Sequence, residues 1–178
     1  MKQLLFSFIL FSTFIACNLQ SKNTENKMTQ ESFNVIGISV RTTNKDGMAM
    51  TDLGQLWHQF YAENCISKIP NKLSDDVYAV YTNYKSDYTD EYTTIIGCKV
   101  KSLDSIPNGF EGKQIQSGSF VKYTAKGKMP DVIMATWKDI WSKDKELNRA
   151  YTADYEVYGK KSQDPNNAEV DIYIATKE

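Results

Sequence analysis

The chain has 178 residues, and 21 Lys and Arg against 22 Asp and Glu give a formal net charge of −1. This near-neutral composition contains no basic block or stripe, which argues against nucleic acid as a partner. The chain has one histidine, three unclustered cysteines and no Cys-x-x-Cys-His motif, so we expect no zinc, no haem and no other cofactor.

The N-terminal segment is typical of a bacterial lipoprotein export signal. An apolar run at 4–15 is too short to span a bilayer and ends at Ala16-Cys17. A small residue directly before a cysteine matches the cleavage pattern of lipoproteins, whereas an ordinary signal peptide with an incidental cysteine is the alternative. We therefore expect residues 1–16 to be a signal peptide and Cys17 to carry lipid.

The segment that follows predicts how the folded domain is attached to the membrane. Residues 17–32 are polar and have no apolar periodicity, so we expect a tether between the lipid and the folded domain. Lipid on Cys17 would anchor the protein to a membrane, facing the periplasm or the cell surface. Asn18 is not the acidic residue that retains some lipoproteins in the inner membrane, which slightly favours the outer membrane. Residues 33–178 suit a single domain.

The first half of this domain predicts a strand, a helix and two further strands. Alternating apolar positions and β-branched residues indicate strands at 33–43, 77–84 and 91–101. A helix at about 49–64 is indicated by apolar residues at helical spacing, namely Leu53, Leu56, Trp57, Phe60 and Tyr61. A Pro- and Gly-containing linker follows at 103–112.

The second half repeats this order. A strand is expected at 113–126, with a bulge or bend at 117–119, and two more strands at 153–159 and 169–177. Between them, Pro130 suits the first position of a helix. The apolar stripe of that helix is formed by Ile133, Met134, Trp137, Ile140 and Trp141.

A repeated motif supports a duplication. Tyr-Ala-Val-Tyr at 78–81 recurs as Tyr-Glu-Val-Tyr at 155–158, and each copy follows a helix that carries a tryptophan. The predicted fold is α+β: duplicated βαββ units form a mostly antiparallel sheet with two helices packed on one side. The repeat halves are about 33–101 and 112–178, and a cleft is expected between them.

The two copies differ where Ala79 in the first is Glu156 in the second. Strand alternation leaves two alternatives, because Glu156 lies either on the wet face of the sheet or in an aromatic cleft. In a cleft, its carboxylate would attract a desolvated organic cation, and each ring face would add roughly 0.5–2 kcal/mol. Burial would also raise its pKa, which would suit general-acid chemistry.

Together these motifs resemble the GyrI-like small-molecule-binding domain, which is also the effector-binding domain of some AraC-type and MerR-type multidrug regulators. The duplication, the Trp57 helix, the Met129-Pro130 helix start and the last strand carry the resemblance, over about residues 33–177. The resemblance implies a ligand cleft between the halves, with Glu156 as its acid. No helix-turn-helix is present in the sequence, so a role in transcription is not carried over.

The candidate ligand-binding residues combine pocket acids with aromatic walls. Asp171 is expected as a second acid that shares its face with Tyr173, because its strand would pair with the strand of Glu156, and a solvated strand position is the alternative. Core packing is the alternative for Trp57 and Trp137, which lie in the middle of their helical stripes. The full set is Glu156, Trp57, Tyr61, Tyr81, Tyr123, Trp137, Trp141, Tyr158, Asp171 and Tyr173.

Three functions follow from these residues. The first is binding of a small, aromatic or cationic molecule, for sequestration or sensing. The second is hydrolysis of a reactive small molecule with Glu156 as acid and base. This hypothesis rests on that residue and the resemblance alone, because no nucleophile elbow, phosphate loop or metal spacing is present. The third is a protein-interaction or inhibitor module with a protein partner at the cleft.

Overall fold

The computed structural model describes residues 26–178. The predicted signal peptide at 1–16 and the predicted lipidation site at Cys17 lie outside these residues and stay predictions. Within 26–178, none of the helices is both long enough and apolar enough to cross a membrane.

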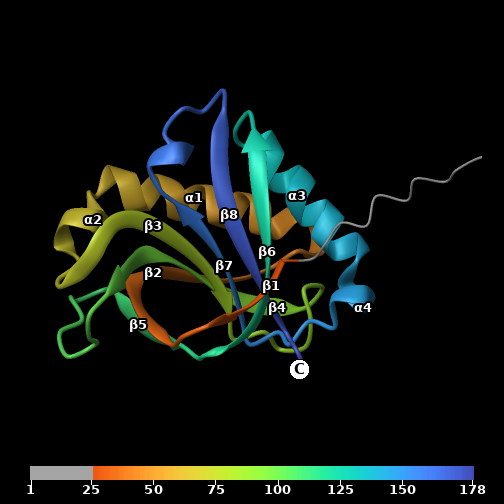
Figure 1. Cartoon of the computed structure of the whole chain (residues 1–178). Helices are drawn as coiled ribbons and strands as arrows, with labels where there is room; N and C mark the ends of the chain where they lie inside the picture. The colour runs from red at the N-terminus through yellow and green to blue at the C-terminus, as the bar shows by residue number, and fades with distance from the viewer. Residues whose placement is uncertain (1–25) are drawn as a thin grey trace, which may run out of the picture.

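The strands form one eight-stranded sheet in the order β1-β6-β8-β7-β3-β4-β2-β5, and every pairing between neighbours is antiparallel. Their bounds are β1 Asn26–Gln30, β2 Phe33–Thr43, β3 Lys72–Thr82, β4 Glu91–Val100, β5 Glu111–Ile115, β6 Gly118–Gly127, β7 Ala153–Tyr158 and β8 Ala168–Thr176. The sheet curls on itself, as Figure 1 shows.

Two long helices cover one face of this sheet. Helix α1 buries Leu56 and Phe60 against β2, β3 and β4, and α3 buries Trp137 and Ile140 against β6 and β8. In Figure 1, α1 passes behind β7 and β8, and α3 runs beside β6. The helices are α1 Met48–Ala62, α2 Cys65–Lys68, α3 Asp131–Ser142 and α4 Asp144–Leu147, with 3-10 turns η1 Lys45–Gly47 and η2 Lys160–Ser162.

The predicted duplication and fold class are confirmed. The first repeat contributes the neighbours β3-β4-β2 and the second contributes β7-β8-β6, so the two repeats meet where β3 pairs with β7. The repeats also exchange strands: β1 precedes β2 but pairs with β6, whereas β5 precedes β6 but pairs with β2. This exchange ties each half to the other through backbone hydrogen bonds.

The exchange corrects the prediction of one strand at 113–126. This segment is two strands, and β5 and β6 belong to opposite ends of the sheet. Ile115 and Phe120 are both buried in the core of the curled inner face, so the chain crosses that face between them. Apolar residues on both sides of the crossing mimic the pattern of one bulged strand.

The tether prediction is also wrong in part, because Asn26–Gln30 forms β1. This strand adds to the free edge of β6 through main-chain hydrogen bonds, which need no apolar periodicity in the added sequence. Similarly, β3 begins at Lys72 rather than 77, with an irregularity between Lys72 and Val77 that disrupts the alternation.

The curled inner face is filled by side chains from both repeats. Tyr155 of β7 stacks on Tyr173 of β8, with ring centroids 4.7 Å apart, and Phe33 packs on Tyr155 edge to face. Since side chains alternate along a strand, Tyr155 and Glu156 point to opposite faces. The inner face is therefore a packed core, and the helix face carries the candidate site.

Candidate ligand-binding site

Glu156 lies at the centre of the duplication. Ala79 of β3 is directly opposite Glu156 of β7 in the antiparallel register. These two positions also correspond to each other in the repeated Tyr-x-Val-Tyr motif, so the pair lies on the approximate twofold axis of the molecule. The methyl group of Ala79 leaves room for a single carboxylate at that axis.

The carboxylate of Glu156 is fully buried and is held by neutral donors. Its side chain is 0 % exposed. Trp137 Nε1 donates a hydrogen bond to Oε1 at 2.5 Å, and the Tyr158 hydroxyl donates to Oε2 at 2.7 Å. None of the ion pairs formed within residues 26–178 includes Glu156. The alternative of a solvated strand position is therefore wrong.

Burial raises the pKa of Glu156, and hydrogen bonds from Trp137, Tyr158 and Tyr81 oppose that rise. Burial also raises the pKa of Tyr81 and Tyr158 well above their ordinary value, and the nearby charge of Glu156 raises them further. Both hydroxyls therefore stay protonated at neutral pH. Glu156 is therefore held by donors that do not neutralise its charge.

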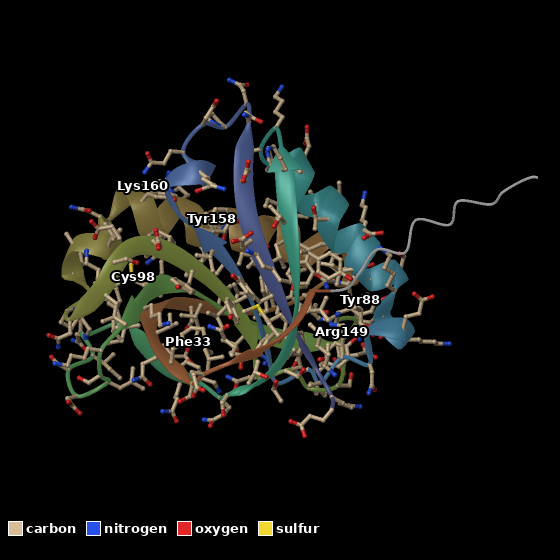
Figure 2. The ribbon with its side chains drawn as sticks, viewed as in Figure 1. Phe33, Tyr88, Cys98, Arg149, Tyr158 and Lys160 are labelled. Carbon is tan, nitrogen blue, oxygen red and sulfur yellow. The ribbon has the colours of Figure 1, made fainter. Side chains whose placement is uncertain are left out.

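Aromatic rings surround this acid with the same twofold symmetry. Trp57 of α1 packs edge to face on Tyr158, with ring centroids 5.0 Å apart, and Trp137 of α3 packs on Tyr81 in the same way at 5.1 Å. Tyr81 and Tyr158 occupy equivalent positions of the repeat, so each helix contacts the tyrosine of the other half. Figure 2 shows Tyr158 where β7 passes α1.

On each helix, a further aromatic ring lies next to the tryptophan. Tyr61 stacks on Trp57 at 5.8 Å, and Trp141 lies 6.1 Å from Trp137 at a tilt of 33°. Both pairs are four residues apart on their helix, a spacing that places side chains on one face. Tyr61 and Trp141 therefore occupy equivalent positions in the two repeats.

These rings line a cavity of about 1190 Å³ on the helix face of the sheet. This volume is slightly above the usual range for small-molecule sites, roughly 300–1,000 Å³. Tyr123 packs against the core beside α3 and does not line the cavity. The predicted residues that do line it are Glu156, Trp57, Tyr61, Tyr81, Trp137, Trp141 and Tyr158. Their contact with a ligand stays a prediction.

The prediction that Asp171 supplies a second pocket acid is wrong. Glu156 is opposite Ile172 in the β7–β8 register, so Asp171 and Tyr173 point to the other face of the sheet. There, Asp171 forms an ion pair with Lys122 at 2.8 Å. Strand alternation gives the relative orientation of Asp171 and Tyr173, but only the register between strands relates them to Glu156.

The tyrosines of the β3–β4 hairpin also belong to the site and were not predicted from the sequence. Tyr84, Tyr88 and Tyr92 all line the cavity, and Tyr88 stacks on Trp141 at 5.5 Å with an interplanar angle of 7°. Asn44 holds this hairpin, since its Nδ2 donates to the Tyr88 carbonyl at 2.7 Å and its Oδ1 accepts from the Tyr92 hydroxyl at 2.8 Å. A tyrosine at every fourth position in a polar hairpin was the available signal.

A second buried acid lies next to the cavity and is fully paired. Asp154 and Arg149 have side chains that are 0 % exposed and form an ion pair at 2.5 Å. Asp154 also accepts hydrogen bonds from the Tyr84 hydroxyl at 2.7 Å and from the Ala175 backbone N–H at 2.9 Å. Figure 2 shows Arg149 close to Tyr88, whose ring centroid is 5.9 Å from the guanidinium carbon. This cluster positions the hairpin tyrosines.

Comparison with known proteins places the chain in a family. It matches the Cass2 family, described as integron-associated effector binding protein, over residues 28–176. An integron cassette protein from the mobile metagenome of Vibrio cholerae is 32 % identical, with a TM-score of 0.65 over 85 % of this chain and 95 % of that chain.

Two further relatives widen the comparison. The Bacillus subtilis (strain 168) protein YobU, described as a candidate transcriptional regulator, is 29 % identical over 146 residues, which are 79 % of this chain and 90 % of YobU. The structure of SAV2435 bound to tetraphenylphosphonium has a TM-score of 0.71 over 86 % of this chain and 93 % of that chain. At 14 % identity, that likeness shows the fold alone. The chain belongs to the Cass2 family of integron-associated effector-binding proteins.

Proposed function

We propose that this protein binds a lipophilic organic cation in the cavity between α1 and α3, with Glu156 as the counterion. The observation that carries the proposal is a fully buried carboxylate, on the axis of an aromatic cavity, with no ion-pair partner among residues 26–178. A buried charge without a partner costs several kcal/mol. A bound cation would supply the missing charge.

The aromatic walls suit such a cation. Trp137 and Tyr158 direct their N–H and O–H groups to Glu156, so the polar ends of these residues are satisfied within the protein. Their rings, together with Trp57 and Tyr81, offer surfaces that attract positive charge, at roughly 0.5–2 kcal/mol for each well-placed contact. A small hydrated cation would lose its hydration shell here without enough polar partners, which favours organic cations.

The comparisons support the same class of ligand. The family is described by effector binding, and SAV2435, which has a similar fold, is bound to tetraphenylphosphonium, a lipophilic cation. For the hydrolase and protein-partner hypotheses, we find no feature of the site that favours either over binding. Both stay alternatives that the experiment below addresses.

The test compares two ions of the same shape and opposite charge. Isothermal titration of the purified protein with tetraphenylphosphonium and with tetraphenylborate should detect binding of the cation only. Glu156→Gln should weaken the cation at least about tenfold, equivalent to ~1.4 kcal/mol. Equal binding of both ions, or an unchanged affinity in the variant, would contradict the proposal. Mass spectrometry of the recovered ligand separates binding from hydrolysis.

We further propose that lipid on Cys17 places the cavity at a membrane surface. Lipophilic cations concentrate at anionic membranes, so this position would suit sequestration or sensing. Cell fractionation of the wild type and of Cys17→Ser tests the proposal. We expect the wild type in the membrane fraction and the variant in the soluble fraction, and the same distribution for both would overturn it.

A further inference from the structure

Helix α1 presents a stripe of residues to the cavity that is interrupted by a glycine. The stripe consists of Met50, Gly54, Trp57 and Tyr61, whose spacings of four, three and four place them on one helix face, and all of them line the cavity. At its ends, Met50 is 70 % exposed and Tyr61 is 64 % exposed. The stripe is therefore an uncharged apolar wall that leads from the cavity to the surface, with a notch at Gly54.

The backbone does not require a glycine at position 54. Gly54 lies within α1 outside the left-handed region, and an added Cβ would meet nothing within 4 Å. By contrast, Gly37 and Gly97 face each other across β2 and β4, where an added Cβ would lie 2.2 Å and 2.1 Å from a carbonyl oxygen. A glycine in a helix interior is less favourable than alanine, so Gly54 lowers stability without a packing reason.

The second repeat has a side chain at the equivalent position. When Trp57 and Trp137 are aligned, the residue that corresponds to Gly54 is Met134 of α3, which also lines the cavity. The α3 wall of the cavity therefore presents a methionine side chain where the α1 wall presents no side chain. This asymmetry distinguishes the two walls of an otherwise twofold aromatic site.

The notch is connected to the carboxylate of Glu156 through Trp57 and Tyr158. Gly54 and Trp57 are separated by about 4.5 Å along the helix, and the Trp57 ring contacts Tyr158, which binds Glu156. We propose that the notch at Gly54 is a subsite for an uncharged aryl or alkyl arm of the ligand. The inference rests on the proposed function. It assigns as ligands those lipophilic cations whose charge lies at Glu156 and whose apolar arm points towards α1.

The experiment fills the notch with a larger side chain and replaces one aryl arm of the ligand. Gly54→Met gives α1 the side chain that α3 has, and Gln55→Met is the control, since Gln55 is exposed on the same helix and does not line the cavity. Affinities are measured for tetraphenylphosphonium and for methyltriphenylphosphonium, which replaces one phenyl arm by a methyl group. Gly54→Met should weaken tetraphenylphosphonium about tenfold and methyltriphenylphosphonium much less. The control should bind both as the wild type does.

A second variant separates ligand binding from folding. Gly54→Ala should raise Tm by about 2–4 °C, because alanine favours the helix. It should also reduce the preference for tetraphenylphosphonium over its methyl analogue. Unchanged affinities, or an equal loss for both ligands in Gly54→Met, would overturn the subsite. If the wild type binds neither cation, the proposed function fails and the subsite fails with it. If binding depends on Glu156 but not on residue 54, only the subsite fails.

Discussion

Asp154 and Glu156 are two buried carboxylates on the same face of β7, and they are held in different ways. Asp154 forms an ion pair with Arg149 and accepts two further hydrogen bonds. Glu156 accepts hydrogen bonds from Trp137 and Tyr158 and has no cation beside it within the described chain. Because both are 0 % exposed, burial alone does not distinguish them. Their ion pairing distinguishes them. Asp154 is paired with Arg149, whereas Glu156 lines the cavity and has no ion-pair partner among residues 26–178.

The largest expected effect is on folding, at Asp154. Asp154→Asn should destabilise the protein by about 3–5 kcal/mol, because Arg149 would lose its fully buried partner and keep only the longer ion pair with the partly exposed Asp144 at 3.3 Å. Urea unfolding measures this loss. The comparison would be contradicted if this variant lost less stability than Glu156→Gln in the same experiment.

Glu156→Gln should reduce cation affinity rather than stability. We expect unchanged or increased stability without ligand, since the substitution removes a buried charge that lacks a counterion. Cation affinity should fall at least about tenfold. Thermal unfolding with and without tetraphenylphosphonium reports both quantities, because a ligand that binds only the folded state raises Tm. A large loss of stability without ligand would show that Glu156 is structural as well.

A smaller effect is expected from the donor on the indole ring. Trp137→Phe keeps a ring but removes the hydrogen bond to Glu156, which should destabilise the ionised carboxylate by about 1–3 kcal/mol and raise its pKa. Trp57→Phe is the matched control, because no hydrogen bond from the Trp57 indole is found in residues 26–178. Cation affinity measured against pH should shift in the first variant only. A shift of equal size in both would show that the ring, not the donor, matters.

The smallest effect is the dependence of stability on pH. Burial raises the pKa of Glu156, so the folded protein takes up a proton at this site more readily than the unfolded chain does. The resulting stability is fully present below the unfolded pKa and is lost as pH rises through the folded pKa. Over the same window, cation affinity should increase. Both trends should be absent in Glu156→Gln, and wild-type trends in that variant would assign them to another group.

The sequence was informative where the signal was local or repeated. Helical spacing placed Trp57 and Tyr61 on one face of α1, and Trp137 and Trp141 on one face of α3. The substitution of Glu156 for Ala79 in the repeated motif identified the acid before its surroundings were known. These inferences need only the periodicity of single elements and a comparison of two copies.

The features that could not be predicted depend on pairing between distant segments. The position of Asp171 follows from the β7–β8 register, in which a shift of one residue would exchange the two faces of the strand. The exchange of β1 and β5 between repeats consists of backbone hydrogen bonds, which leave little trace in side-chain pattern. The hairpin tyrosines are held at the cavity by contacts with Asn44, Asp154 and Arg149, which are distant in the sequence.

A crystal structure of the protein with tetraphenylphosphonium would show directly whether Glu156 is the counterion. We expect the cation to lie in the cavity with Glu156 as its nearest carboxylate and a phenyl group at Gly54. A cation bound outside the cavity, or one paired with a different carboxylate while Glu156 keeps only Trp137 and Tyr158, would contradict this expectation.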